Sequence, residues 1–298
     1  MHSIFLAFFE FSRTALSMEI AGVALFLISI FAAKSAIAQG RGLDKVVALA
    51  NLCFAMPLAV FGAEHLSAAQ GISLGVPKYM PWPLFWAYFV GLALIAASLS
   101  IATKIQVQWS GFLFGCMMFL FVAMMDLPGT LAEPHNRIAW ALLAREMSFG
   151  AGGWALAATA MSASQSSKLI TVGRIVIGTA AIFYGVEHFL HRINVPGVPL
   201  EKLMYDWVPL RPAISYVTGA ILIVGGAGIL LPKKTRISAT YLGTWILLLV
   251  VVVYGPILAI SVVDPSTAVK VEGLNYFFDT LLYAGTILAL AQAAPATD

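Results

Sequence analysis

The chain has 298 residues, of which 17 are Lys or Arg and 14 are Asp or Glu, so charged residues make up only 10% of it and hydrophobic residues 60%. An ordinary soluble domain carries about 25% charged residues. A compact soluble protein of this length could not cover its surface with so few charges, which excludes a soluble enzyme, a nucleic-acid-binding protein and a disordered chain. The composition predicts an all-α polytopic membrane protein whose first partner is the lipid bilayer.

About nine apolar segments are long enough to cross the roughly 30 Å hydrocarbon layer, which takes about 20 helical residues. The first is interrupted by Glu10, Arg13 and Glu19. This leaves two possibilities open for residues 4–17, an amphipathic helix on the membrane surface or a part of the first span. The expected spans are 18–38, 46–67, 82–103, 105–127, 138–161, 170–191, 212–232, 237–261 and 272–293.

The basic residues predict an orientation. Nine of them follow the first, third, fifth and seventh spans, in loops whose one acidic residue is Asp44, whereas the other loops hold five acidic residues. Because loops rich in Lys and Arg stay in the cytoplasm, we expect the N-terminus outside and the C-terminus inside. The basic residues are Lys34, Arg41, Lys45, Lys104, Lys168, Arg174, Lys233, Lys234 and Arg236, and the acidic ones are Glu133, Glu201, Asp206, Asp264 and Glu272.

A repeated pattern divides the chain. Residues 61–66 (FGAEHL) match 184–189 (YGVEHF), and further matches follow in the same order. These pair Pro81, Tyr88 and Gly91 with Pro209, Tyr216 and Gly219, Pro128 with Pro256, and Glu146 and Gly152 with Asp279 and Gly285.

These matches predict an internal duplication. We expect an N-terminal segment with the first span (1–43), a four-helix bundle (44–161), a Ser-rich linker (162–169) and a second four-helix bundle (170–298). Units with an even number of spans have parallel topology, so a pseudo-two-fold axis along the membrane normal can relate them.

Ionisable side chains inside a membrane are costly, which makes each one a functional candidate. Most of the candidates fall near the outer ends of their spans, so we expect one outward-facing cleft in each unit. We also expect Arg145 to pair with Asp126 or Glu64 on another helix, because neighbours in sequence point to different helix faces. The candidates are Glu64, His65, Asp126, Arg145, Glu146, Glu187, His188, His191 and Asp279.

The Glu-His pairs permit three interpretations. The first is a set of hydrogen bonds that hold helices together. The second is a proton relay or ligand site, because a carboxylate can tune an imidazole near neutral pH. The third is a metal site at Glu187, His188 and His191, but Ala68 stands where the first unit would need the second histidine, so no metal site is predicted.

No cofactor motif is recognisable. The sequence has no GxGxxG run, phosphate loop, nucleophile elbow or cysteine cluster, and its two cysteines, Cys53 and Cys116, lie in separate apolar runs. Hence we predict neither a catalytic residue nor a bound cofactor from the residues themselves.

The motif order resembles that of the DoxX-like family of bacterial integral membrane proteins. The resemblance rests on 62–66 (GAEHL), 86–91 (WAYFVG) and 126–128 (DLP), with 185–189 (GVEHF), Tyr216, Gly219 and 255–256 (GP) in the second unit. Many relatives have a histidine before Leu-Pro, whereas this chain has Asp126 and Tyr254 at those positions. The resemblance implies four-helix units in the bacterial cytoplasmic (inner) membrane and a link to quinone-dependent redox systems.

Two functions are therefore expected. The first is a non-catalytic accessory or assembly subunit of a membrane redox system, with other redox subunits as partners and quinone as the related cofactor. The alternative is a small-molecule or proton-coupled carrier that uses the Glu64/His65 and Glu187/His188 pairs. An enzyme acting on quinone or lipid in the outer cleft is a weaker third hypothesis.

Overall fold

The computed structural model describes residues 2–208 and 210–295, with side chains from Arg13 onward, and within them it is built of helices, with no strand. Pro209, which the repeat pairs with Pro81, lies outside the described residues. The long helices are α1 (His2–Gln39), α3 (Ala50–Ser67), α5 (Pro83–Thr103), α6 (Val107–Phe121), α8 (Arg137–Ala158), α9 (Ala163–Leu190), α10 (Ala213–Leu230), α11 (Thr235–Leu249) and α13 (Thr267–Ala293). Short helices α2 (Asp44–Val47), α4 (Ala69–Ser73), α7 (Leu127–Ala132) and α12 (Gly255–Val262) join or extend them.

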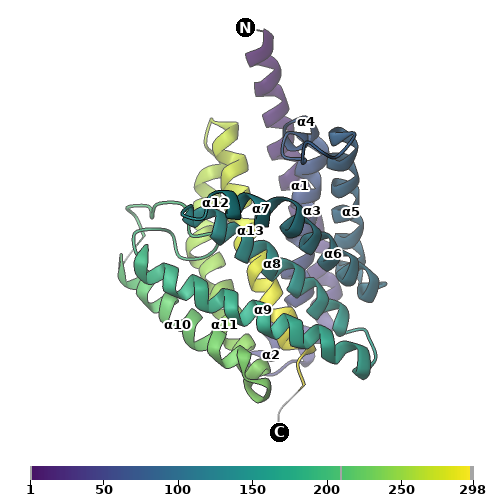
Figure 1. Ribbon diagram of the computed structural model, residues 1–298, viewed down its shortest axis with the longest axis vertical. Helices are drawn as coiled ribbons and strands as arrows, with labels where there is room; N and C mark the ends of the chain where they lie inside the picture. Colours follow the sequence, from purple (N-terminus) through teal and green to yellow (C-terminus); the bar gives the residue numbers. More distant parts are fainter. Residues whose placement is uncertain (1, 209, 296–298) are drawn as a thin grey trace.

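Eight helical segments of the described chain are long and apolar enough to cross a membrane, which confirms an all-α polytopic membrane protein. The ninth expected span is α8, which is 22 residues or roughly 33 Å long but carries Arg137, Arg145 and Glu146 and is not among the eight. Because α1 begins at one end of the molecule and α13 finishes at the other (Figure 1), the chain crosses an odd number of times, and α8 supplies the remaining crossing.

One uninterrupted helix, α1, covers the N-terminal region where two possibilities were open. Residues 4–17 continue the helix of the first span, and the apolar candidate span runs over Arg13–Gln39. The N-terminal part of α1 projects beyond the other helices in Figure 1.

The loops alternate between two ends of the molecule. The acidic end carries the loops 68–82, 133–136, 191–212 and 263–266, and the basic end carries 40–49, 104–106, 159–162 and 231–234. In Figure 1, α4 and α7 lie toward one end and α2 toward the other. Thus the sequence pattern of basic and acidic loops corresponds to two physical faces.

The two halves, α3–α8 and α9–α13, share local features at equivalent places. Each contains one π-helical turn, Val122–Asp126 in the first half and Val250–Tyr254 in the second, and each turn directly precedes the matched proline region. A Cβ atom on Gly91 would lie 2.9 Å from Cβ of His65, and one on Gly219 would lie 3.1 Å from Cβ of His188. Both halves thus use a glycine to bring a neighbouring helix against the histidine.

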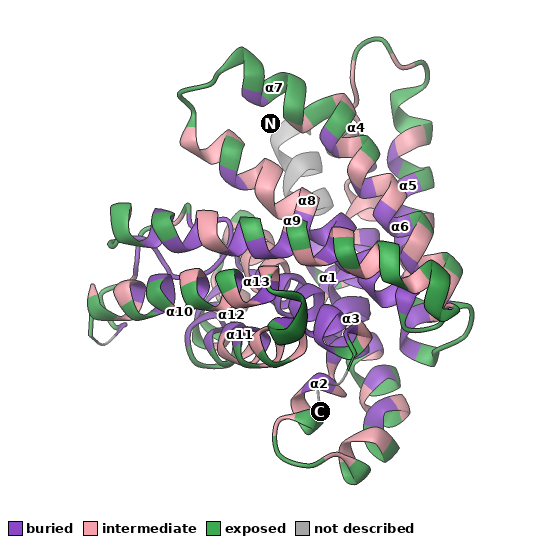
Figure 2. Ribbon diagram, turned by 60° about the horizontal axis from the view of Figure 1, so that its bottom comes forward, coloured by how far each residue is buried: buried purple, intermediate pink, exposed green. Residues whose placement is uncertain are grey.

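The halves interlock. The last helix of each half packs against the first helix of the other, α8 against α9 and α13 against α3, and α8 also packs against α13. Of the apolar window in α13, 78% is buried, against 22% in α1, so α13 is a core helix, and it lies in the middle of the molecule in Figure 2. Helices α13 and α3 approach each other closely at Gly285. A Cβ atom on this glycine would lie only 2.7 Å from the carbonyl carbon of Cys53.

Candidate functional site

An ion-pair cluster lies where α8 meets α13. The guanidinium of Arg145 donates from Nη1 to Oδ2 of Asp279 at 2.5 Å, and from Nη2 to Oε1 of Glu146 at 2.8 Å. The three side chains are between 14% and 17% exposed. Arg145 stands eight residues into α8, about 12 Å from its start at the acidic end, so the charges lie within the span.

Two more carboxylates belong to this cluster. Glu64 on α3 accepts a hydrogen bond from Nδ2 of Asn275 at 3.0 Å, one turn of α13 before Asp279, and it interacts electrostatically with Asp279. Asp126, the last residue of the first π-helical turn, lies within electrostatic range of Arg145 and Glu146. We call Glu64, Asp126, Arg145, Glu146 and Asp279 the shared cluster.

The partners of Arg145 and the grouping of the candidate residues differ from those expected from the sequence. Arg145 pairs with its neighbour Glu146 and with Asp279, and no ion pair joins it to Asp126 or Glu64. The long Arg145 side chain can fold back along α8, which an argument from helix faces alone does not consider. Because α13 packs between α3 and α8, residues of both halves meet in one cluster rather than in one cleft for each unit.

Glu187, His188 and His191 form a second, separate group with Arg137 of α8. Nη1 of Arg137 donates to Oε2 of Glu187 at 3.2 Å and to the carbonyl oxygen of Leu200 at 3.1 Å. His191 Nε2 lies 3.6 Å from the same Glu187 oxygen. Arg137 thus ties the first half to the second half and to the loop that follows α9.

Both ring nitrogens of His188 are occupied. The backbone N–H of Gly197 donates to Nε2 at 3.1 Å, so Nε2 is the acceptor, and Nδ1 donates to the carbonyl oxygen of Tyr184 at 2.6 Å. These partners assign a neutral imidazole with the proton on Nδ1. Since His188 is also 0% exposed, the arrangement favours the structural interpretation for this histidine.

A buried loop segment covers His188. Residues 194–200 are all buried, and Thr280 of α13 donates to the carbonyl oxygen of Val198 at 3.2 Å. Lys202 next to this segment pairs with Glu272 of α13 at 3.2 Å. Partial burial lowers the pKa of Lys202, but hydrogen bonds to Tyr205 and Glu272 outweigh this and hold its pKa above the usual value.

The equivalent place in the first half is more open. His65 donates from Nδ1 to the carbonyl oxygen of Phe61 at 2.8 Å, but its Nε2 has no partner among the described residues. Both His65 and Glu64 are partly exposed, and the loop 68–82 is partly exposed over most of its length. The two Glu-His pairs are therefore alike in sequence and different in surroundings.

A row of buried polar atoms along α13, on both sides of Asp279, has no hydrogen-bond partner in the described chain. Within the described chain, Asn275 Oδ1, Tyr283 Oη and Thr286 Oγ1 are buried and have no hydrogen-bond partner. Together with Asp279 they are spaced by three or four residues, so they share one face of the helix. Buried polar groups of this kind are commonly satisfied by water.

No group of three His, Cys, Asp or Glu side chains among the described residues is placed to hold a metal ion. In the one arrangement that the sequence suggested, His188 already uses both ring nitrogens, while only His191 approaches Glu187. Cys53 and Cys116 are both free.

Four residues in or next to the two clusters were not among the candidates predicted from the sequence. Asn275 could have been found, because it stands four residues before Asp279 on the same helix face. Arg137 gave a weaker signal as a charge at the start of a span. Tyr184 and Thr280 gave none, since they act through backbone carbonyls of Ala141 and Val198.

Comparison with models of protein families, with curated proteins and with solved structures finds no match to this chain.

Proposed function

We propose that this chain is a proton-coupled carrier of a small molecule and that the shared cluster is its proton-binding site. The observation that carries the proposal is the imbalance of charge: the shared cluster holds four carboxylates, from α3, the first π-helical turn, α8 and α13, and one guanidinium. Glu146 and Asp279 pair with Arg145 directly, whereas Glu64 and Asp126 do not.

The charge imbalance has a physical consequence. An unpaired carboxylate inside a membrane protein costs several kcal/mol of desolvation, which proton uptake removes. Acidic groups that bind and release protons in this way are a common feature of membrane transporters. Glu64 and Asp126 are the candidates for exchange, because Arg145 pairs directly with the other two carboxylates.

The surroundings of the cluster supply a direction for proton movement. On the side of the acidic end, the imidazole of His65 follows Glu64 in the chain, and its Nε2 makes no hydrogen bond to the part of the chain that the structure describes. On the inner side, the unpartnered Tyr283 and Thr286 hydroxyls extend the polar face of α13. Hydrated groups at both places would let protons reach the cluster and leave it.

Transport in vesicles tests this proposal. The purified chain is reconstituted with a pH-sensitive dye inside, and pools of amino acids, sugars and organic acids are added outside. We expect one pool to acidify the lumen, the Glu64→Gln/Asp126→Asn double variant to lose this response, and the loop variant Glu133→Gln to keep it. If no pool acidifies the lumen beyond protein-free vesicles, or if the double variant transports like the wild type, the proposal is wrong.

A second candidate function is the non-catalytic accessory or assembly subunit of a quinone-linked redox system. The observation that favours it is the rigid connection between the halves, because Arg137 bridges to Glu187 and to the covering loop, and Gly285 packs directly on the Cys53 backbone. Such contacts suit a scaffold that holds partner subunits better than a carrier with moving halves. In that case the quinone would belong to the partners.

Purification in a mild detergent from the native membrane distinguishes the two functions. Stoichiometric recovery of redox subunits, with no transport by the isolated chain, would support the accessory role. Recovery of the chain alone, together with transport, would contradict it.

A further inference from the structure

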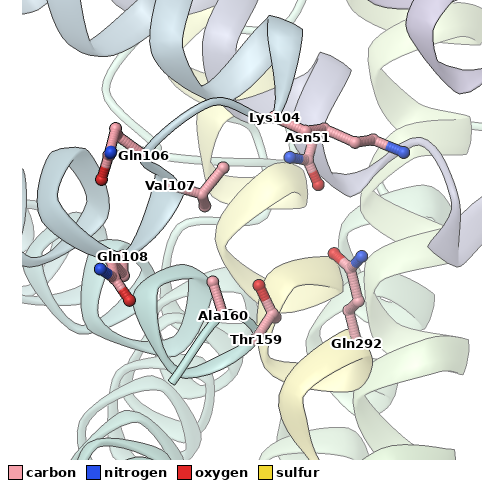
Figure 3. A pocket seen from close by; sticks show the side chains of 8 residues that line it. All are labelled: Asn51, Lys104, Gln106, Val107, Gln108, Thr159, Ala160 and Gln292. Carbon is pink, nitrogen blue, oxygen red and sulfur yellow. The ribbon is translucent and has the colours of Figure 1, made fainter. Parts of the chain in front are cut away.

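A polar cavity of about 370 Å³ opens at the basic end of the molecule, opposite the shared cluster. Four segments line it: the start of α3, the turn between α5 and α6, the residues just after α8, and the end of α13 (Figure 3). The cavity thus lies at the seam between the interlocked halves, and it has the volume of a small-molecule site.

The cavity wall carries positive charge and amide groups. Lys104 is its only charged lining residue, and it makes no ion pair with any described residue. Gln106, Gln108 and Gln292 add carboxamides that make no hydrogen bond to the described residues. The side-chain amide of Asn51 already has a partner within the protein, because it donates to the carbonyl oxygen of Ile101 at 3.1 Å. The ammonium group of Lys104 and the amides of the three glutamines can therefore donate hydrogen bonds to a bound anion.

The backbone at the start of α6 also favours an anion. Helix α6 starts at Val107 in the cavity wall, and Gln106 before it has φ of 57° and provides no side-chain cap. The carbonyl oxygen of Gln106 accepts from the N–H groups of Trp109 and Ser110, while the N–H groups at the helix start remain available. The start of a helix attracts anions, and Lys104, whose side chain extends away from Gln106 in Figure 3, adds a cation elsewhere in the cavity wall.

We propose that this cavity binds a phosphate group. A phosphate has several acceptor oxygens, which fit a lining with one cation, several N–H donors and no carboxylate. The cavity opens where lysines and arginines collect, and basic pockets between membrane helices hold lipid headgroups. Both an anionic phospholipid and a free phosphate compound offer this chemistry.

Native mass spectrometry of the full chain in nonionic detergent tests the proposal. Phosphatidylglycerol is compared with a glucosyl diacylglycerol of the same acyl length, which has no phosphate. The glycolipid lacks the charge-assisted hydrogen bonds that a phosphate accepts, so we expect the phospholipid to bind about tenfold more tightly than the glycolipid. Equal binding of the two lipids to the wild-type chain would overturn the proposal.

Three variants locate the site. Lys104→Asn removes the cation while retaining a residue that tolerates the φ of 61° at this position. Gln108→Glu adds a negative charge to the wall with little change of shape and serves as a second, independent probe. Each should weaken phospholipid binding about tenfold, whereas the control Lys168→Asn, an exposed lysine of the same end outside the cavity, should not. Unchanged binding to both cavity variants would contradict the assignment.

Inorganic phosphate separates the two sources of the ligand. If millimolar phosphate displaces the phospholipid from the wild-type chain but not from residual sites in Lys104→Asn, the cavity accepts free phosphate. If phosphate has no effect while the variants still lose phospholipid, the occupant is a lipid headgroup. Either outcome supports a phosphate site, and neither depends on the proposed transport function.

Discussion

The guanidinium of Arg145 on α8 donates to the carboxylate of Asp279 on α13 at 2.5 Å, although 134 residues separate them in the chain. This ion pair joins the last helices of the two halves within the membrane region. The predicted duplication pairs Asp279 with Glu146, and Arg145 binds both of these carboxylates.

Removal of the cation should destabilise the protein more than removal of one carboxylate. Arg145→Met leaves the carboxylates of the shared cluster without a counter-charge, and we expect it to lower the free energy of unfolding by about 3–5 kcal/mol. Asp279→Asn should cost less, because Arg145 keeps Glu146. Equilibrium denaturation in detergent measures both, and the double variant should show a coupling energy of about 0.5–3 kcal/mol. Strictly additive effects would show that the two side chains do not interact.

The two histidines should differ in their contribution to stability. His188→Ala removes a fully buried ring with two hydrogen bonds and leaves the Gly197 N–H without an acceptor, so we expect a loss of about 3 kcal/mol or more. His65→Ala at the equivalent position should cost about 1 kcal/mol, because that ring is partly exposed and makes one bond. Thermal unfolding of the two variants under the same conditions provides the comparison. Equal losses would refute the structural role assigned to His188.

A single methyl group should loosen the contact between the halves. A Cβ atom on Gly285 would lie 2.8 Å from both the carbonyl oxygen of Cys53 and the backbone nitrogen of Phe54, and backbone atoms cannot rotate away. Gly285→Ala should therefore lower the free energy of unfolding by about 1–3 kcal/mol. Gly71→Ala is the control, since nothing lies within 4 Å of its added Cβ atom. The idea fails if both variants unfold like the wild type.

The predicted orientation can be tested by cysteine labelling in intact cells. In a chain with Cys53 and Cys116 replaced, Gly75→Cys lies on the acidic end and Ser164→Cys on the basic end, and both positions are exposed. The excess of basic residues at the second end predicts that it faces the cytoplasm. A membrane-impermeant maleimide should react with Gly75→Cys at once and with Ser164→Cys only after permeabilisation. The reverse order of labelling would invert the topology.

Much of the fold could be predicted from the chain itself, because length and hydropathy define the spans directly. This includes α8, which corresponds to the expected span 138–161 although its three charges keep it out of the eight most apolar segments. The interlocking of the halves could not be predicted, because the repeat shows which positions correspond but not which helices touch. For the same reason Arg145 was assigned the wrong partner.

The contrast between the two Glu-His pairs also required the structure. Residues 61–66 and 184–189 share the same Gly, Glu and His positions, yet the segment 194–200 covers only the second pair. That segment, Val-Pro-Gly-Val-Pro-Leu after Asn194, is apolar for a loop, which in retrospect is a signal of burial. Its position over His188 depends on contacts with Arg137 and Thr280 from distant helices.

Infrared difference spectroscopy of the purified chain tests most directly whether the shared cluster binds protons. A titration from about pH 5 to about pH 9 spans the range in which carboxyl groups with perturbed titration exchange their protons. The charge imbalance predicts a protonated carboxyl C=O band near neutral pH in the wild type and in Glu133→Gln, and its loss in Glu64→Gln/Asp126→Asn. Absence of that band from the wild type, or a band of equal intensity in the double variant, would contradict a proton-binding cluster.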